Sequence, residues 1–211
     1  MLSRQGLAAV LRSYGPIGFL RLACEIVLTK AEFPKARLIR WPNDIRGRRW
    51  IRIGSNFTSG RGLRMEVLPQ RQQDRQPYID IDDNVQVNDH VHIAAAQSVK
   101  IGKNVLIASK VFISDHNHGS YGANGQHDSP VIHPLDRRLQ IAPVVIDEDV
   151  WIGEFVSILP GVHIGAGAVI GTMSVVNRNI PAYSIAVGSP ARVIKRFNFD
   201  SQQWEPVKSQ S

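Results

Sequence analysis

Aliphatic residues recur every six positions through much of the chain, and this period constrains the fold more than any other feature of the sequence. Ile or Val occupies positions 81, 87 and 93, then 101, 107 and 113, then 146, 152, 158, 164, 170 and 176. The residue that follows each of them is usually small or short. A second inward residue stands four places after most of them: Val85, Val91, Val105, Val111, Val150, Val156, Val162 and Ala168.

A period of six fits neither an amphipathic helix, which repeats every 3.6 residues or so, nor a simple alternating strand. It fits a chain that makes a short strand and a corner in each unit, so that three units close a triangular coil. Each aliphatic residue then stacks on its equivalent one coil away, as in other solenoids. A β-sandwich would need turn signals about every 8–12 residues, and the sequence lacks them. The period therefore predicts an all-β parallel β-helix of hexapeptide repeats.

The repeat is interrupted twice. The step from Ile93 to Ile101 is eight residues, which predicts a two-residue bulge at a corner. The step from Ile113 to Ile146 is 33 residues, which predicts a long excursion loop over residues 119–142. Long loops on a regular scaffold often carry function, so this loop is the first place to look for a site.

Three regions follow from the repeat. Residues 1–50 form a basic N-terminal extension that we expect to be partly helical, and residues 51–196 form the β-helix. Within it, Ile51–Phe57 has the pattern of an early, irregular coil. Residues 197–211 are predicted to be a polar C-terminal tail without clear structure.

The first 30 residues have the spacing of an amphipathic helix broken around Gly15-Pro16. The apolar stretch 17–28 is interrupted by Arg21 and Glu25, which argues against both a signal peptide and a membrane span. Two interpretations stay open for this helix. It packs on the body or on another subunit, or it makes a peripheral membrane contact through its basic residues.

The chain carries 25 Lys and Arg against 18 Asp and Glu, for a net charge of +7. Such a balance favours nucleic acid, an anionic membrane surface or a phosphorylated ligand. The basic residues are dispersed and are not interleaved with aromatic residues, so we expect no nucleic acid partner. A single cysteine, Cys24, excludes an internal disulfide. We expect a cytoplasmic protein, with the inner face of the cell membrane as the alternative location.

Residues 101–118, 150–153 and 188–194 resemble segments of the hexapeptide-repeat acyltransferases, and the resemblance covers about residues 79–196. Within that superfamily the chain is most similar to the maltose/galactoside type and to the O-acetyltransferases of bacterial polysaccharide and lipopolysaccharide assembly. The resemblance implies a left-handed coil and a homotrimer with active sites between neighbouring prisms. It also implies acetyl-CoA-dependent transfer to a sugar or glycan-precursor hydroxyl.

A sugar hydroxyl is a poor nucleophile, so a base near neutrality must take its proton, and histidine titrates in that range. By resemblance, the base is His118, at the start of the excursion loop. Asn88, 30 residues earlier, matches an asparagine that holds the acceptor hydroxyl in the galactoside-type enzymes. His116 is the rival base, and Asp115 is a candidate to orient one of the two imidazoles.

The resemblance also implies a set of CoA-binding residues, in which fixed positive charge faces the phosphates. These are Trp151 near the thiol end, Thr172, Asn177 and Arg178 near the adenine and ribose, and Arg192 and Lys195 near the phosphates.

Ala96 and Arg138 stand where some relatives carry acidic residues, which argues against a simple maltose or galactoside acceptor. A glycan precursor of a surface polysaccharide is favoured, and the amino group of an amino sugar is the alternative.

Two other classes of protein remain to be weighed. The Asp and His residues around the excursion loop suggest a zinc-dependent, γ-carbonic-anhydrase-like protein, but the His-x4-His pair of those enzymes is missing and we expect no metal. A non-catalytic scaffold is opposed by the matched spacing of Asn88 and His118.

Overall fold

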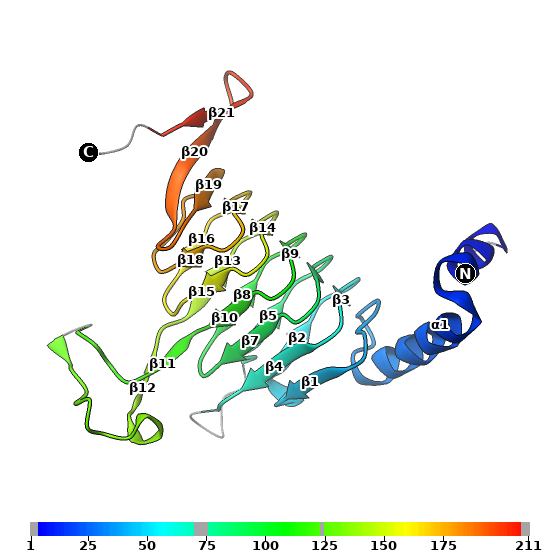
Figure 1. Cartoon of the computed structure of the whole chain (residues 1–211), viewed down its shortest axis with the longest axis horizontal. Coiled ribbons are helices and arrows are strands. Elements are labelled where there is room, and N and C mark those ends of the chain that lie inside the picture. Colours follow the sequence, from blue (N-terminus) through cyan, green and yellow to red (C-terminus); the bar gives the residue numbers. More distant parts are fainter. Residues whose placement is uncertain (1–3, 70–75, 123–124, 208–211) are drawn as a thin grey trace.

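The computed structural model describes residues 4–69, 76–122 and 125–207. The chain is a left-handed parallel β-helix, with a helix at its N-terminal end, a β-meander at its C-terminal end and an excursion from its middle (Figure 1). The six-residue period predicts the parallel β-helix, and the family resemblance implies its left hand.

Three sheets form the faces of the prism. Face 1 contains β2 (Ile51–Ile53), β5 (Ile79–Ile81), β8 (Val99–Ile101), β13 (Val144–Ile146) and β16 (His163–Ile164). Face 2 contains β3 (Thr58–Ser59), β6 (Gln86–Val87), β9 (Leu106–Ile107), β14 (Trp151–Ile152) and β17 (Val169–Ile170). Face 3 contains β1 (Asn43–Arg46), β4 (Leu63–Val67), β7 (His92–Ala95), β10 (Phe112–Ser114), β15 (Ser157–Ile158) and β18 (Val175–Val176). The chain runs through faces 1, 2 and 3 in turn.

The predicted stacking of aliphatic residues is confirmed by the strand register. On face 2, Val87 lies opposite Ile107, and Ile152 lies opposite both Ile107 and Ile170. All four side chains are buried. The equivalent stacks on the other two faces complete one continuous core inside the prism.

The corner between faces 1 and 2 is held by a ladder of side-chain amides. Asn56, Asn84, Asn104 and Asp149 each have φ between 58° and 61°, the left-handed region that Asn and Asp tolerate best after Gly. The amide of each Asn donates to the next side chain along the corner, at 3.0, 3.2 and 3.0 Å. The repeat therefore needs asparagine here for backbone geometry as well as for size.

The solenoid begins earlier than residue 51. The predicted early coil at Ile51–Phe57 is confirmed, but β1 also pairs with β4, and Leu38 bridges Thr58 in parallel. A segment that the sequence places in the extension is therefore already an edge of the prism. Its pairing depends on contacts with later coils, which a period cannot reveal.

Helix α1 (Arg4–Glu32) is interrupted at Gly15 (φ 66°, ψ 176°), just before Pro16, where the sequence predicts the break. Its second half is fixed to the first coil by Thr29. The hydroxyl of Thr29 donates to the Glu25 carbonyl at 2.6 Å and accepts from the Ile39 amide at 2.8 Å. In the described part of the chain, no helix is both long enough and apolar enough to cross a membrane.

The C-terminal region differs from the prediction of an unstructured tail. After β19 (Ser184–Val187), β20 (Arg192–Asn198) and β21 (Gln203–Pro206) continue face 2 as an antiparallel meander. Edge-on contacts join Tyr183 to Phe199, and Phe197 to Phe199 and Trp204, with ring centroids 4.9–5.3 Å apart. These aromatic contacts stabilise strands that otherwise contribute few apolar residues, among them Val193, which packs against the core.

Candidate functional site

The excursion leaves the prism as a two-stranded ribbon. β11 (His116–His118) pairs antiparallel with β12 (Leu139–Ile141), so that His118 lies opposite Leu139. The excursion therefore begins directly after Asp115, a few residues before the predicted loop over 119–142. His116 and His118 both belong to the ribbon.

Asp115 fixes the root of this ribbon. It is fully buried, and its Oδ1 accepts a hydrogen bond from the amide of Ala96 at 2.7 Å. Its Oδ2 accepts from the amides of Gln97 and Ser98, each at 2.7 Å. These three amides belong to the bulge that the eight-residue step predicts. The carboxylate thus satisfies the backbone of the bulge and ties it to the excursion.

The same carboxylate orients His116. Nδ1 of His116 lies 2.9 Å from Oδ1 of Asp115, and the His116 side chain is only 9% exposed. Burial alone would raise the pKa of Asp115, but the hydrogen bonds from His116 and from the three backbone amides outweigh it, and the net pKa is lowered. Asp115 is therefore an anion at neutral pH, and it holds the Nδ1 proton of His116 toward itself.

His118 has a different environment. Its side chain is exposed, and its imidazole makes no hydrogen bond to any residue that the structure describes. Its carbonyl accepts from the Tyr121 hydroxyl at 2.7 Å, and Arg137 donates to the same hydroxyl at 2.8 Å. The backbone of His118 is thus fixed while its imidazole is free to meet a substrate.

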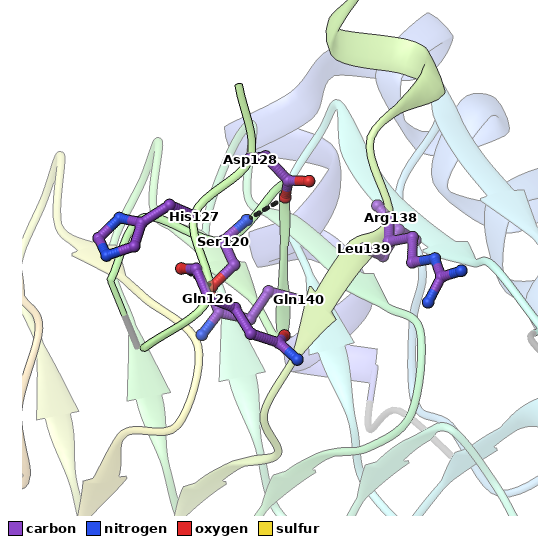
Figure 2. A pocket seen from close by; sticks show the side chains of 7 residues that line it. All are labelled: Ser120, Gln126, His127, Asp128, Arg138, Leu139 and Gln140. Carbon is purple, nitrogen blue, oxygen red and sulfur yellow. Dashed lines mark hydrogen bonds between the residues drawn. The ribbon is translucent and has the colours of Figure 1, made fainter. Parts of the chain in front are cut away.

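A cavity of about 310 Å³ opens in the excursion (Figure 2). His118 does not line it, but Leu139, which lies opposite His118 on the ribbon, does. Asp128 shapes it by accepting from the Ser120 amide at 2.6 Å. Figure 2 shows Arg138, which stands where some relatives carry an acidic residue, on the side of the cavity opposite His127. The lining residues are Ser120, Gln126, His127, Asp128, Arg138, Leu139 and Gln140.

Asn88 lies in a second cavity, of about 430 Å³, at the corner between faces 2 and 3. Gln86 donates to its Oδ1 at 3.4 Å. Arg37, Leu38 and Arg40 from the segment after α1 form one wall, and residues 58–60 and 86–89 with Ser109 form the rest. His118 does not line this cavity.

Asn88 and His118 are separated within one chain. Asn88 precedes face 3, whereas Asp115 and the ribbon follow it, at the corner between faces 3 and 1. Asn88 and His118 are therefore on opposite edges of face 3. The structure therefore does not bring the two predicted site residues together in a single chain.

The predicted CoA-binding residues are divided in the same way. Thr172 shares the corner of Asn88, whereas Asn177 and Arg178 share the corner of the ribbon, farther along the prism. Trp151 is 52% exposed on face 2. Arg192 and Lys195 are exposed on β20, which extends that face. All six side chains are accessible to a ligand on the outside of the prism.

The histidines near the excursion do not form a metal site in the described residues, where no three His, Cys, Asp or Glu side chains gather in a metal-binding arrangement. His116 is paired with Asp115. His133 accepts from the amide of Leu135 at 3.3 Å, as the N-cap of a short 3₁₀ helix, η3 (Pro134–Asp136).

Sequence reasoning missed two features of the site. The backbone partners of Asp115 lie 17 to 19 residues away, at the bulge. The eight-residue step predicts the bulge, but it does not indicate which side chain accepts the hydrogen bonds of the bulge amides. The arginine wall beside Asn88 was also missed, because residues 37–40 carry no repeat.

Comparison with known proteins defines the class. Residues 143–178 match the family model described as bacterial transferase hexapeptide (six repeats). A solved maltose O-acetyltransferase from Clostridium difficile 630 is 29% identical, with 69% of each chain covered and a TM-score of 0.50. AntD, an N-acyltransferase from Bacillus cereus, has a TM-score of 0.65 over 83% of this chain and 89% of its own, at 20% identity, and supports the fold alone.

A relative of nearly full length extends the comparison. The Escherichia coli K12 protein named "Putative lipopolysaccharide biosynthesis O-acetyl transferase WbbJ" is 46% identical over 194 residues, which are 92% of this chain and 96% of that protein. The chain therefore belongs to the hexapeptide-repeat acyltransferases, and it is an acyltransferase.

Proposed function

We propose that this protein is an acetyl-CoA-dependent O-acetyltransferase that acts on a sugar hydroxyl of a glycan precursor in the biosynthesis of a bacterial surface polysaccharide. The observation that carries the proposal is the 46% identity to WbbJ across almost the whole chain. The exposed imidazole of His118, on the ribbon whose strand β12 lines the cavity of the excursion, supplies the base that such a reaction requires.

His118 is the general base in this proposal. Its imidazole takes the proton of the acceptor hydroxyl as the oxygen attacks the thioester carbonyl of acetyl-CoA. The tetrahedral intermediate collapses with cleavage of the C–S bond, and the CoA sulfur leaves with the proton returned by the imidazolium. His116 is the weaker candidate, because its side chain is nearly buried, whereas that of His118 is exposed.

The division of the site supports a homotrimer. In a three-fold assembly, the Asn88 corner of one prism faces the ribbon of its neighbour, so that each site takes Asn88 from one protomer and His118 from the next. Acetyl-CoA then lies in the groove between two prisms. Trp151 contacts its thiol end, Thr172, Asn177 and Arg178 contact the adenine and ribose, and Arg192 and Lys195 contact the phosphates.

Helix α1 suggests where the enzyme works. Ile17, Leu20 and Val27 expose 84%, 66% and 68% of their surface. A cytoplasmic protein that touches the inner face of the membrane would meet a lipid-linked acceptor there, and the same apolar side chains would also suit a neighbouring subunit. Deletion of residues 1–32 should move the protein from the membrane fraction to the cytosolic fraction of cells. Unchanged partitioning would favour the subunit contact.

The test is acetyl-CoA turnover, followed by thiol release, with a panel of sugars, amino sugars and glycan precursors. Wild type is compared with His118→Ala and with a matched control, His163→Ala, whose exposed imidazole bonds Asp147 on face 1. We expect transfer to one acceptor class, a loss of ~10²–10⁴-fold in His118→Ala and no large loss in the control. Transfer only to amino sugars would overturn the hydroxyl assignment. Transfer that survives His118→Ala would move the base elsewhere.

A further inference from the structure

The cavity at Asn88 has a wall that the hexapeptide repeat does not build. Residues 37–40 run beside β3: the amides of Arg37 and Leu38 donate to the Phe57 carbonyl at 2.9 and 3.2 Å. The amide of Arg40 donates to the Ser59 hydroxyl at 3.1 Å. These bonds fix the backbone of the segment, so that Arg37 and Arg40 both line the cavity that contains Asn88.

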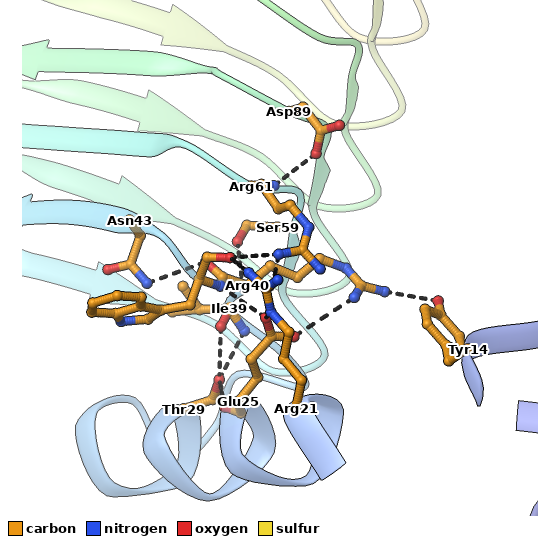
Figure 3. A network of polar contacts seen from close by, with 11 residues as sticks. Tyr14, Arg21, Glu25, Thr29, Ile39, Arg40, Asn43, Ser59, Arg61 and Asp89 are labelled. Atoms are coloured by element: carbon orange, nitrogen blue, oxygen red, sulfur yellow. Dashed lines mark hydrogen bonds and ion pairs between the residues drawn. The ribbon is translucent and has the colours of Figure 1, made fainter. Parts of the chain in front are cut away.

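Arg40 is held by a buried carboxylate on helix α1 (Figure 3). Glu25 is 2% exposed, and its Oε2 lies 3.7 Å from Nη1 of Arg40. The Oε1 of the same carboxylate lies 3.2 Å from Nε of Arg21 and 3.9 Å from Nη1 of Arg61. Arg40 also donates to the Tyr14 hydroxyl at 3.1 Å. Three guanidinium groups therefore share one carboxylate, and the network keeps a surplus of positive charge.

The remaining charges of the cavity do not cancel this surplus. Arg37 is exposed, and its side chain makes no ion pair with the residues that the structure describes. Asp89 is the one acidic side chain in the lining, and its Oδ1 accepts the amide of Arg61 at 2.7 Å. An anion in the cavity would thus meet one free arginine and one arginine in a fixed position, with the carboxylate of Asp89 turned toward the backbone.

We propose that the Asn88 cavity is an acceptor subsite for a sugar that carries an oxyanion, which Arg37 and Arg40 bind while Asn88 holds the sugar end. The inference rests on the proposed role of Asn88 at the acceptor. The oxyanion is a phosphate, as in a glycosyl phosphate or diphosphate, or the carboxylate of an acidic sugar. Guanidinium groups bind both with paired, charge-assisted hydrogen bonds. A volume of about 430 Å³ is in the range of small-molecule sites.

The experiment is a calorimetric titration of the full chain in saturating CoA, so that the donor phosphate site is already filled. The probes are methyl α-glucoside, glucose 1-phosphate, UDP-glucose and glucuronic acid, which share a pyranose ring, so their relative affinities report the anion. We expect at least one charged probe to bind roughly 10-fold or more tightly than methyl α-glucoside. A preference for the two phosphorylated probes identifies a phosphate, and a preference for glucuronic acid identifies a carboxylate.

Arg37→Gln should abolish this preference, and Lys103→Gln, which removes one exposed positive charge from the corner between faces 1 and 2, should retain it. Arg40→Gln should reduce it as well, and its thermal unfolding reports any damage to the Glu25 network. Equal affinity for neutral and charged probes, or a preference unchanged in Arg37→Gln, would overturn the proposal. Arg37-dependent binding of a charged probe without acetyl transfer to any acceptor would keep the subsite and reject the acetyltransferase function.

Discussion

Asp115 is the residue on which the two unusual parts of the solenoid depend. Its carboxylate accepts three backbone amides from the bulge and faces the imidazole of His116. Removal of a buried acceptor leaves its donors without partners, which costs more than the net value of the bonds. The bulge and the root of the excursion should therefore loosen together when this side chain is changed.

Asp115→Ala should lower the free energy of unfolding by about 3 kcal/mol, because three backbone amides, in one buried and two part-buried hydrogen bonds, lose their acceptor. Urea denaturation measures the change. Asp136→Asn is the matched control, since this exposed carboxylate lies in the same excursion and the substitution should alter stability by less than about 0.5 kcal/mol. Equal stability of Asp115→Ala and wild type would contradict the role of the carboxylate.

The lowered pKa of Asp115 also makes stability depend on pH. Because the pKa of the folded state lies below that of the unfolded state, its contribution is complete above about pH 4 and is lost as the pH falls through the folded value. The amide of Asn does not titrate in this range. Asp115→Asn should therefore show a smaller loss of stability than wild type between about pH 4 and pH 2, measured by urea midpoints.

His116→Ala separates the two histidines. We expect a loss in kcat of less than about 10-fold, together with lower stability, because His116 supports Asp115 and His118 is the proposed base. Steady-state kinetics and thermal unfolding of the same preparation measure both quantities. A loss as large as that of His118→Ala, in a protein that unfolds like wild type, would make His116 the base.

Sequence reasoning at the residue scale found side chains that lie in register with the repeat. Asn88 and His118 stand at fixed steps from aliphatic positions, so their corners follow from the period. The six-residue period did not predict the backbone partners of Asp115 or the arginines around Glu25. Their contacts join segments that are distant in the sequence, and a local pattern carries no record of such contacts.

At the scale of elements, helix α1 contacts the first coil through the hydroxyl of Thr29 and through the buried carboxylate of Glu25. The carboxylate of Glu25 lies within 4 Å of the guanidinium groups of Arg21, Arg40 and Arg61. A neutral side chain there leaves three guanidinium groups in mutual repulsion and exposes the junction between α1 and the first coil.

Glu25→Gln should destabilise the protein by about 3 kcal/mol and should increase the rate at which trypsin cleaves within residues 4–32. Glu32→Gln, an exposed carboxylate on the same helix, is the control. Thermal unfolding and limited proteolysis measure the two effects. Unchanged cleavage in Glu25→Gln would show that other contacts hold the helix.

The elements that the sequence predicts best are those inside the repeat. The three faces, the bulge and the existence of the excursion all follow from where the six-residue step holds and where it fails. β1 and the β20–β21 meander did not follow, because their registers are set by pairing with strands already in place. Aromatic contacts between residues outside the six-residue repeat stabilise the meander.

For the whole molecule, the separation of Asn88 from His118 predicts a specific result of subunit mixing. His118→Ala and Asn88→Ala proteins are each expected to be inactive as pure assemblies. Random mixing of equal amounts should restore about one quarter of wild-type activity. A site between two protomers is intact when its Asn88 comes from a His118→Ala protomer and its His118 comes from an Asn88→Ala protomer, and this combination occurs in about one quarter of the sites. Co-expression with two affinity tags provides the mixed assemblies. No restored activity would place both residues of each site in one chain.

The coils of the prism are equally spaced along its axis, so positions on successive coils differ by a fixed distance. The ribbon that bears His118 leaves the coil of β10, and Asn177 follows β18, two coils farther on, or roughly 10 Å along the axis. A ligand that reaches from the ribbon to Asn177 therefore spans a distance equal to a whole number of coil spacings. Duplication of one coil, the 18 residues 147–164, would lengthen that reach by roughly 5 Å and leave both ends of the molecule as they are. Insertion or deletion of whole coils therefore changes this distance in steps of that size.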